Sequence, residues 1–340
     1  MTTLTDQDLG LWDRVEELVD RAPSWEALRL HRLHLIAARV RSRRGEAIPT
    51  SISDEWRSRT MMALTARAVL KRVRNAYEGR LLLMKGPEVA WRYPDPTDRP
   101  FRDLDILVDN PHSAQRSLIN AGCVEFGGQA PHHLPALFWP DVPVLIELHG
   151  RPKSPPWLPQ VSAEMVFGHA TPSHTPIDGL LAPDPGVHAL LLAAHDWAHD
   201  PLRRLGDVID IAATLQDSDR AKTTACAREW GWDRLWAMTV AVTDAVTMGG
   251  ALPKWLSIWT RHLLTGRDRT VVEHQLTQLV APAYSVPARQ APRRLARHVR
   301  DVVPPRTNET WGHRVRRSRQ ALFHALMEES VHELRTPAPR

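Results

Sequence analysis

Two short apolar runs of this chain carry carboxylates at a spacing that suits metal chemistry. Asp103 and Asp105 are two residues apart in the first run, and Glu147 and His149 repeat this spacing in the second. Residues two apart in a β-strand point to the same face, so each pair is expected on one face of its strand. Three carboxylates gathered at one point repel one another unless a cation neutralises them, and such oxygen ligands suit Mg²⁺ or Mn²⁺. The pattern therefore predicts a site for a divalent cation.

A Lys-Gly-Pro sequence precedes the first carboxylate pair. Lys85, Gly86 and Pro87 follow the apolar run 81–84, which is typical of a buried strand, and Pro87 is well placed to begin a helix. Glycine permits close approach of the backbone, free N–H groups at a helix start favour an anion such as phosphate, and the lysine adds positive charge. A Lys-Gly pair alone is weak evidence, but its position just before the carboxylates favours a phosphate-binding turn.

Paired carboxylates with a third from a neighbouring strand suit phosphoryl or nucleotidyl transfer assisted by two metal ions. The ions would lie about 3.5–4 Å apart, one activating the attacking oxygen and one stabilising the leaving group. A lone Asp-x-Asp is more often a solvated strand edge or a turn. Here Leu104 and Ile106 can be buried on the opposite face of the strand, which favours the metal-site interpretation.

Several short motifs resemble, in order and spacing, those of a known family. In chain order they are Leu-Met-Lys-Gly (83–86), Tyr93-Pro94, Arg99-Pro100, Arg102-Asp103-Leu104-Asp105-Ile106-Leu107-Val108, Ala121-Gly122, His132-His133 and Ile146-Glu147-Leu148-His149. Together they resemble the uncharacterised nucleotidyltransferase-like family of the DNA polymerase β nucleotidyltransferase superfamily. The resemblance is close over residues 80–150 and looser through His195 and the segment 204–211.

The resemblance implies a metal-dependent enzyme that moves an NMP group from an NTP to an acceptor, with Mg²⁺ or Mn²⁺ as cofactor. Asp103 and Asp105 are the implied metal ligands. Glu147 is the implied third carboxylate, which shares a metal ion and orients or deprotonates the acceptor hydroxyl. The acceptor stays open between a small molecule, a peptide, a protein and an RNA.

The implied NTP-binding residues are Lys85, Gly86 and Arg102. The wider superfamily has Gly-Ser where this chain has Gly86-Pro87, so the hydroxyl that usually holds a terminal phosphate is absent. Lys85 is expected to take over that role electrostatically. The missing serine motivates an alternative, a non-catalytic nucleotide-binding or regulatory module of the same fold, whereas the complete set of carboxylates favours the enzyme.

Two histidine pairs leave further alternatives. His195 and His199 are four residues apart and would share one helix face, so an HD-type metal phosphohydrolase is a rival interpretation. Pro201 ends that helix, however, and the rival leaves the carboxylate strands without a role, so we expect both histidines to pack or to cap the helix end. His132 and His133 stay open between ligands of acceptor or phosphate and exposed loop residues.

Three regions are expected to position these residues: a helical region over 1–80, a nucleotidyltransferase-like α/β core over 81–170 and a helical domain over 171–340. The expected helices before the core span 6–21, 25–44 and 54–77. The core is expected to contain strands over 81–84, 103–108, 123–126 and 142–149, with helices over 87–91 and 111–121. The predicted class is therefore α+β, a small mixed sheet flanked by N-terminal helices and a C-terminal all-helical domain.

The composition of the chain limits the class of protein and the partners to be expected. The chain has 340 residues, a net charge of +5 and only two cysteines, both isolated, so we expect no disulfide framework. Its start lacks the features of a secretion signal and no apolar stretch suits a membrane span, so a cytoplasmic protein without a membrane partner is expected. Arginines crowd the last 60 residues, which is compatible with an anionic acceptor such as RNA but is better explained by solvated helix faces.

Overall fold

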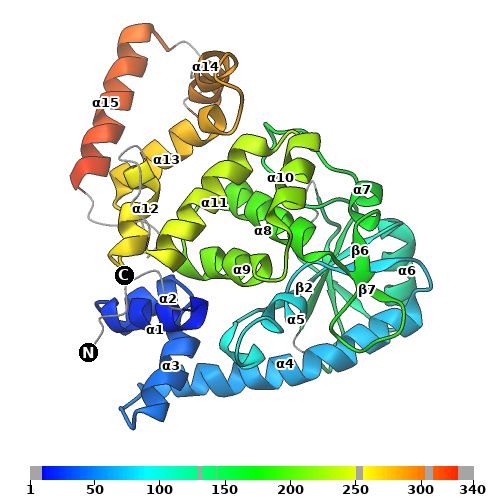
Figure 1. Ribbon diagram of the computed structural model, residues 1–340. Coiled ribbons are helices and arrows are strands. Elements are labelled where there is room, and N and C mark those ends of the chain that lie inside the picture. Colours follow the sequence, from blue (N-terminus) through cyan, green and yellow to red (C-terminus); the bar gives the residue numbers. More distant parts are fainter. Residues whose placement is uncertain (1–9, 129–131, 143, 250–255, 303–308, 328–340) are drawn as a thin grey trace.

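The computed structural model describes residues 10–128, 132–142, 144–249, 256–302 and 309–327. These residues form one seven-stranded mixed sheet, with helices before it in the chain and a larger group of helices after it (Figure 1). The predicted α+β class is confirmed. No helix among the described residues is both long and apolar enough to cross a membrane.

The sheet has the strand order β3-β4-β5-β2-β1-β7-β6. Its strands are β1 (Leu81–Leu83), β2 (Asp103–Val108), β3 (Val124–Phe126), β4 (Ala136–Phe138), β5 (Leu145–His149), β6 (Ala170–Pro172) and β7 (Leu180–Pro183). The pairs β2–β5 and β1–β7 are parallel, and the remaining neighbours are antiparallel. The two strands that carry the carboxylates, β2 and β5, are therefore neighbours in the middle of the sheet.

Three of these strands were not predicted. β4 lies between the third and fourth predicted strands, in a segment that also holds the two adjacent histidines. β6 begins at residue 170, the predicted end of the core, and β7 lies beyond it. Each has only three or four residues, too few to give a clear alternation of polar and apolar side chains. Because β7 pairs with β1, the sheet extends beyond that boundary. The division into three regions stays a prediction.

The helices of the first half of the chain are α1 (Leu11–Arg21), α2 (Trp25–Leu30), α3 (His34–Arg43), α4 (Thr50–Ala76), α5 (Pro87–Ala90), α6 (Pro111–Asn120) and α7 (Ala163–Phe167). A short 3₁₀ turn, η1, spans Pro96–Asp98. The predicted helix 25–44 is broken in two. Its start is correct, since the Ser24 hydroxyl accepts the N–H of Ala27, but Arg32 adopts φ 61° and ends the first piece.

The second half is helical after the sheet. Its helices are α8 (Pro185–His199), α9 (Leu205–Leu215), α10 (Arg220–Glu229), α11 (Asp233–Met248), α12 (Ser257–Leu264), α13 (Val271–Tyr284), α14 (Ala291–Val302) and α15 (Trp311–Met327). The N-terminal helix α1 packs against α9 and α11, so the first described helix belongs to the same helical body as these two helices from beyond the sheet (Figure 1).

The two faces of the sheet contribute to separate apolar cores. Leu104, Ile106 and Ile146 belong to a core completed by the long helix α4 and by α6. Leu82 and Leu107 point to the other face and join the core that holds α8 and α9. Alternation along β2 therefore places its carboxylates on the face that is turned toward the C-terminal helices.

Candidate active site

The register between β2 and β5 brings the predicted carboxylates together. Asp105 is directly opposite Glu147, and Asp103 is opposite Leu145. Since paired residues of parallel strands point to the same face, both aspartates and Glu147 share one face, as the spacing in the sequence predicts. His149, two residues after Glu147, lies on that face as well.

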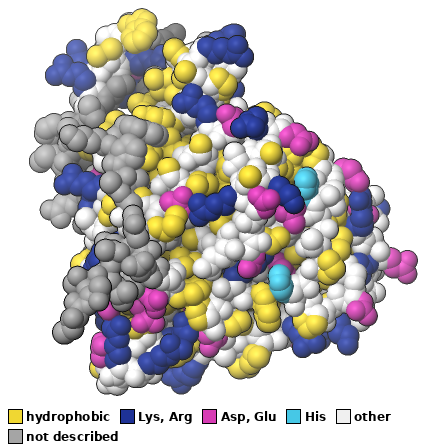
Figure 2. Space-filling model, in the orientation of Figure 1, with side chains coloured by type: hydrophobic (Ala, Val, Ile, Leu, Met, Phe, Trp, Pro, Cys, Tyr) yellow, Lys and Arg dark blue, Asp and Glu magenta, His cyan; other side chains and the backbone are white. Residues whose placement is uncertain are grey.

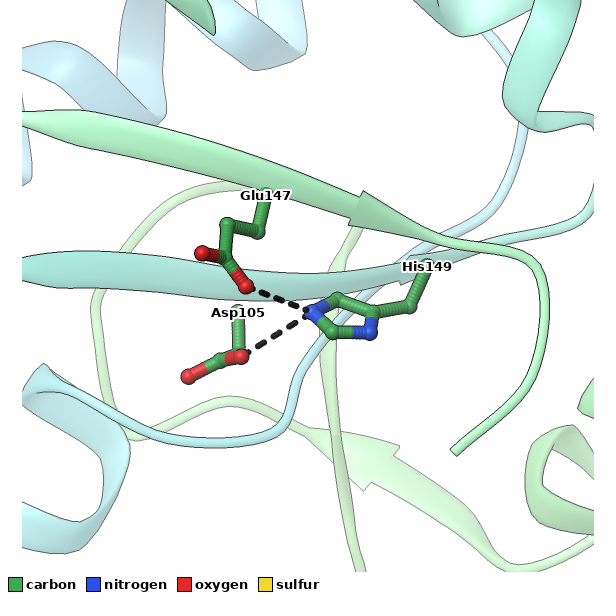
Figure 3. Close-up of side chains that lie close together, drawn as sticks. All are labelled: Asp105, Glu147 and His149. Carbon is green, nitrogen blue, oxygen red and sulfur yellow. Dashed lines mark hydrogen bonds and ion pairs between the residues drawn. The ribbon is translucent and has the colours of Figure 1, made fainter. Parts of the chain in front are cut away.

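Figure 3 shows three of these side chains converging between the strands. Nε2 of His149 lies 2.9 Å from Oδ1 of Asp105 and 3.6 Å from Oε2 of Glu147. One ligand atom from each residue lies within 4.8 Å of the other two, close enough for a single metal ion. Asp105 and His149 are 6% and 2% exposed, so bulk water screens their charges little.

The buried charges shift one another's pKa values. Burial would raise the pKa of Asp105, but the Lys85 ammonium and the hydrogen bond with His149 outweigh it and lower the pKa. The hydrogen bond from His149 lowers the pKa of Glu147. Burial acts to lower the pKa of His149, yet the two carboxylates raise it overall. Positive charge beside these carboxylates therefore keeps both of them ionised.

Asp103 shares the face but differs in its surroundings. Its side chain is half-buried, and burial together with the charges of Asp105 and Glu147 raises its pKa. A carboxylate that two other carboxylates repel is the one that gains most from a nearby cation. Its role as a metal ligand stays a prediction.

The Lys85-Gly86 turn lies directly against the carboxylate strand. The N–H of Met84 donates to the backbone oxygen of Asp105 (2.9 Å). Gly86 adopts φ 64°, and a Cβ there would lie 3.3 Å from the backbone oxygen of Asp103. Only glycine accepts both that conformation and that proximity at little cost. This glycine lets the turn lie against β2, whereas its predicted approach to a phosphate stays a prediction, and the helix that follows, α5, has a single turn.

The other two predicted NTP-binding residues differ in exposure. Lys85 is half-buried and, among the described residues, forms no ion pair within 4 Å. Burial lowers its pKa in spite of the nearby charges of Asp105 and Asp103. Arg102 is exposed, immediately before β2. Lys85 thus lines the same cavity as Asp105, and an NTP role for Lys85 or Arg102 stays a prediction.

A small cavity adjoins the carboxylates. Its volume is about 20 Å³, and its polar walls come from Lys85, Asp105, His149, Lys153 and His195. His195 belongs to α8, whose last residue, His199, lies 2.6 Å from the ammonium nitrogen of Lys153. Sequence reasoning missed Lys153, because a lysine in a proline-rich loop gives no sign of where that loop crosses the sheet.

The adjacent histidines 132 and 133 lie inside the site. His133 forms an isolated bridge with His149, and its Nε2 is 3.7 Å from Oε2 of Glu147. The rings of His132 and His149 are stacked with their centres 5.6 Å apart. Both residues are half-buried, so the alternative of exposed loop histidines is wrong for this pair.

The two aspartates that directly follow His195 and His199 in the sequence make structural contacts. Asp196 accepts the N–H of Leu202 (2.7 Å). Asp200 forms ion pairs with Arg203 (3.2 Å) and Arg269 (3.1 Å), which fasten the end of α8 to the helices that follow. These contacts disfavour the phosphohydrolase alternative.

A second buried polar cluster contacts the Lys85-Gly86 turn from α9 and the loop before β2. Nε and Nη2 of Arg99 each lie 2.7 Å from an oxygen of Asp210, and the Tyr93 hydroxyl donates to the same carboxylate (2.7 Å). Arg99 also donates to the backbone oxygen of Gly86 (3.3 Å). Residues of the Tyr-Pro and Arg-Pro motifs therefore fasten this turn to α9.

A mixed sheet with two carboxylates on one strand and a third on a neighbouring strand is the arrangement that the sequence analysis predicts for a nucleotidyltransferase. A family model described as "Uncharacterised nucleotidyltransferase" matches residues 19–247. Because the match covers more than half of the chain, the protein belongs to this family. Searches of curated proteins and of solved structures find no match.

Proposed function

We propose that this protein is a metal-dependent nucleotidyltransferase that moves an NMP group from an NTP to an acceptor. The observation that carries the proposal is the convergence of Asp105 and Glu147, from neighbouring parallel strands, beside the Lys85-Gly86 turn. Family membership supports the same kind of activity. Neither the NTP nor the acceptor is defined by these residues.

The side chains present fit a divalent cation. Asp103, Asp105 and Glu147 offer oxygen ligands on one face, and Asp105 is buried and ionised. Mg²⁺ and Mn²⁺ both bind such oxygens. When bound, the cation would offset the negative charge of the triphosphate and of the attacking oxygen.

Lys85 and Glu147 have separate roles in the proposed reaction. Lys85, half-buried and without an ion pair among the described residues, holds phosphate oxygens of the NTP. Glu147 orients the acceptor hydroxyl and takes its proton as the acceptor oxygen bonds to the α-phosphorus. The bond between that phosphorus and the bridging oxygen of the pyrophosphate breaks, and pyrophosphate leaves. This displacement conserves atoms and charge without a further reactant.

The acceptor that we favour is anionic. Figure 2 shows Lys and Arg side chains over the end of the molecule formed by α14 and α15. The exposed ones in this part are Arg289, Arg293, Arg297, Arg316 and Arg319. Such a surface attracts phosphate-rich acceptors, RNA among them. The free, buried Cys123 and Cys226 suit the cytoplasm, where we place the protein.

The proposal is tested by incubating the protein with each labelled NTP, Mg²⁺ or Mn²⁺ and a cell extract. We expect the wild type to label one acceptor, and the double variant Asp103→Asn/Asp105→Asn to lose at least about 10³-fold of the rate, since metal assistance contributes several kcal/mol. The exposed Asp54→Asn is the matched control and should label normally. Equal labelling by the double variant would refute the metal assignment. Metal-dependent NTP binding without any labelling would favour the non-catalytic module.

A further inference from the structure

We propose that His149 is a direct ligand of the catalytic metal through Nε2, together with Asp105 and Glu147. This mixed nitrogen and oxygen set makes the site selective for Mn²⁺ over Mg²⁺. The inference rests on the proposed function for its metal, and it goes beyond it in assigning a ligand and a metal preference that the three-carboxylate pattern does not contain.

The geometry places this imidazole nitrogen at the centre of the site. Neighbouring ligands of one ion, bound at roughly 2.1 Å, lie about 3 Å apart. Nε2 of His149 is 2.9 Å from an oxygen of Asp105 and 3.6 Å from an oxygen of Glu147 (Figure 3). These distances are close to the separation that ligands of one cation would have.

The surroundings of His149 favour Nε2 as the donor. The side chain is 2% exposed at the end of β5, so its ring cannot turn away into water. Nδ1 is buried and, within the described part of the chain, has no hydrogen-bond partner. Nε2 is therefore the ring nitrogen that faces the two carboxylates.

The neighbouring histidines are less suited to the same role. Nδ1 of His133 lies 2.6 Å from the backbone oxygen of Leu134, and its Nε2 is 3.7 Å from Glu147. His133 thus faces one carboxylate from the side, whereas His149 contacts the two that belong to different strands. This difference makes His133 a matched control that shares the residue type and the location.

The nature of the donor decides which cation is preferred. Mg²⁺ binds oxygen ligands almost exclusively and tolerates little distortion, whereas Mn²⁺ accepts imidazole nitrogen and binds mixed sets more tightly. A carboxylate in place of His149 would give an all-oxygen set. The preference should therefore follow the identity of residue 149.

Pulsed electron paramagnetic resonance of the Mn²⁺-loaded full chain tests the assignment without any turnover. We expect a coupling from directly bound ¹⁴N in the wild type and in His133→Asn. His149→Asn should lose this coupling and bind Mn²⁺ at least about 10-fold more weakly. His149→Asp should lose the coupling but keep metal binding, with its preference shifted toward Mg²⁺. The exposed His112→Asn should behave as the wild type.

Binding of Mn²⁺ to the wild type without ¹⁴N coupling would overturn the inference. So would a coupling that disappears in His133→Asn and persists in His149→Asn. Equal affinity of the wild type for Mg²⁺ and Mn²⁺ would also contradict it. Circular dichroism of each variant verifies that it is folded. If the protein transfers label but shows no ¹⁴N coupling, the assignment of His149 is wrong and the proposed function still holds. If the protein shows the coupling but never transfers label, the proposed function is wrong and the assignment of His149 still holds.

Discussion

Two buried polar clusters flank the Lys85-Gly86 turn, and they differ in how their charges are balanced. On one side of the turn, Arg99 and Asp210 form a bidentate ion pair with both N···O distances at 2.7 Å, and the Tyr93 hydroxyl donates a hydrogen bond to the same carboxylate. On its other side, three carboxylates share one face with His149. Lys85, which has no ion pair among the described residues, lines the same cavity as Asp105.

The difference separates a structural role from a functional one. The balanced cluster leaves no charge that needs a ligand, and its hydrogen bond to Gly86 fixes the turn. The other cluster gathers three carboxylates, and burial together with the charges of Asp105 and Glu147 raises the pKa of Asp103. Burial of such charges is costly, so an arrangement of this kind points to an external cation or phosphate.

Replacing Asp210 by Asn should produce the largest loss of stability, because it leaves Arg99 buried without its counter-charge. We expect a loss of about 3–5 kcal/mol in the free energy of unfolding, measured by denaturant titration. The control is Asp141→Asn, which removes an equally two-bonded but exposed pair with Arg72 and should cost at most about 1 kcal/mol. Equal losses in both variants would show that burial of the pair is irrelevant.

Replacing Lys85 by Met tests the unbalanced cluster. The variant should fold normally but bind NTP about 10- to 100-fold more weakly, the loss expected for hydrogen bonds to a charged group. Calorimetric titration with a non-hydrolysable NTP and metal measures it. Lys222→Met, at an exposed lysine on α10, should leave the affinity unchanged. An unaltered affinity in the Lys85 variant would remove this residue from the phosphate site.

Replacing Gly86 by Ala tests whether the turn must lie close to β2. The left-handed conformation alone costs a non-glycine residue about 1–2 kcal/mol. Gly45→Ala is the control, since Gly45 also has a positive φ but no atom within 4 Å of an added Cβ. Both variants should lose stability in thermal unfolding, and only Gly86→Ala should lose transferase activity. Normal activity in Gly86→Ala would contradict a requirement for this contact.

The last prediction concerns protonation of a buried histidine outside the site, which changes the free energy of unfolding only below neutral pH. Burial lowers the pKa of His31 to about 4, and its ring accepts the N–H of Leu205. The unfolded chain binds a proton near pH 6.5, whereas the native state does so only near pH 4, so stability should fall as the pH drops through this window. Unfolding free energies of His31→Asn should fall less steeply there. A slope identical to that of the wild type would exclude His31 as a contributor.

The sequence was sufficient for the elements with clear periodicity and for the shared face of the site. The spacing of Asp103 and Asp105 in an apolar run predicts their common face, and β2 spans the predicted residues. The long helix α4 was also predicted, with its ends shifted by a few residues. These features depend on contacts between near neighbours in the chain.

The rest depends on contacts between distant parts of the chain. The register that sets Asp105 opposite Glu147 is fixed by packing of the whole sheet, and the partner of Arg99 lies 111 residues away in α9. The break at Arg32 lacks a glycine or proline to announce it, since packing imposes its left-handed conformation. The position of Lys153 beside the site depends likewise on where a loop crosses the sheet.

The central claim is that the carboxylate face around Asp105 binds a divalent cation. Thermal unfolding of the wild type and of Asp105→Asn, each with and without Mn²⁺, tests it most directly, because a ligand that binds the native state raises the melting temperature. We predict a rise with Mn²⁺ in the wild type and none in the variant. An equal rise in both proteins, or no rise in the wild type, would contradict a metal site built on Asp105.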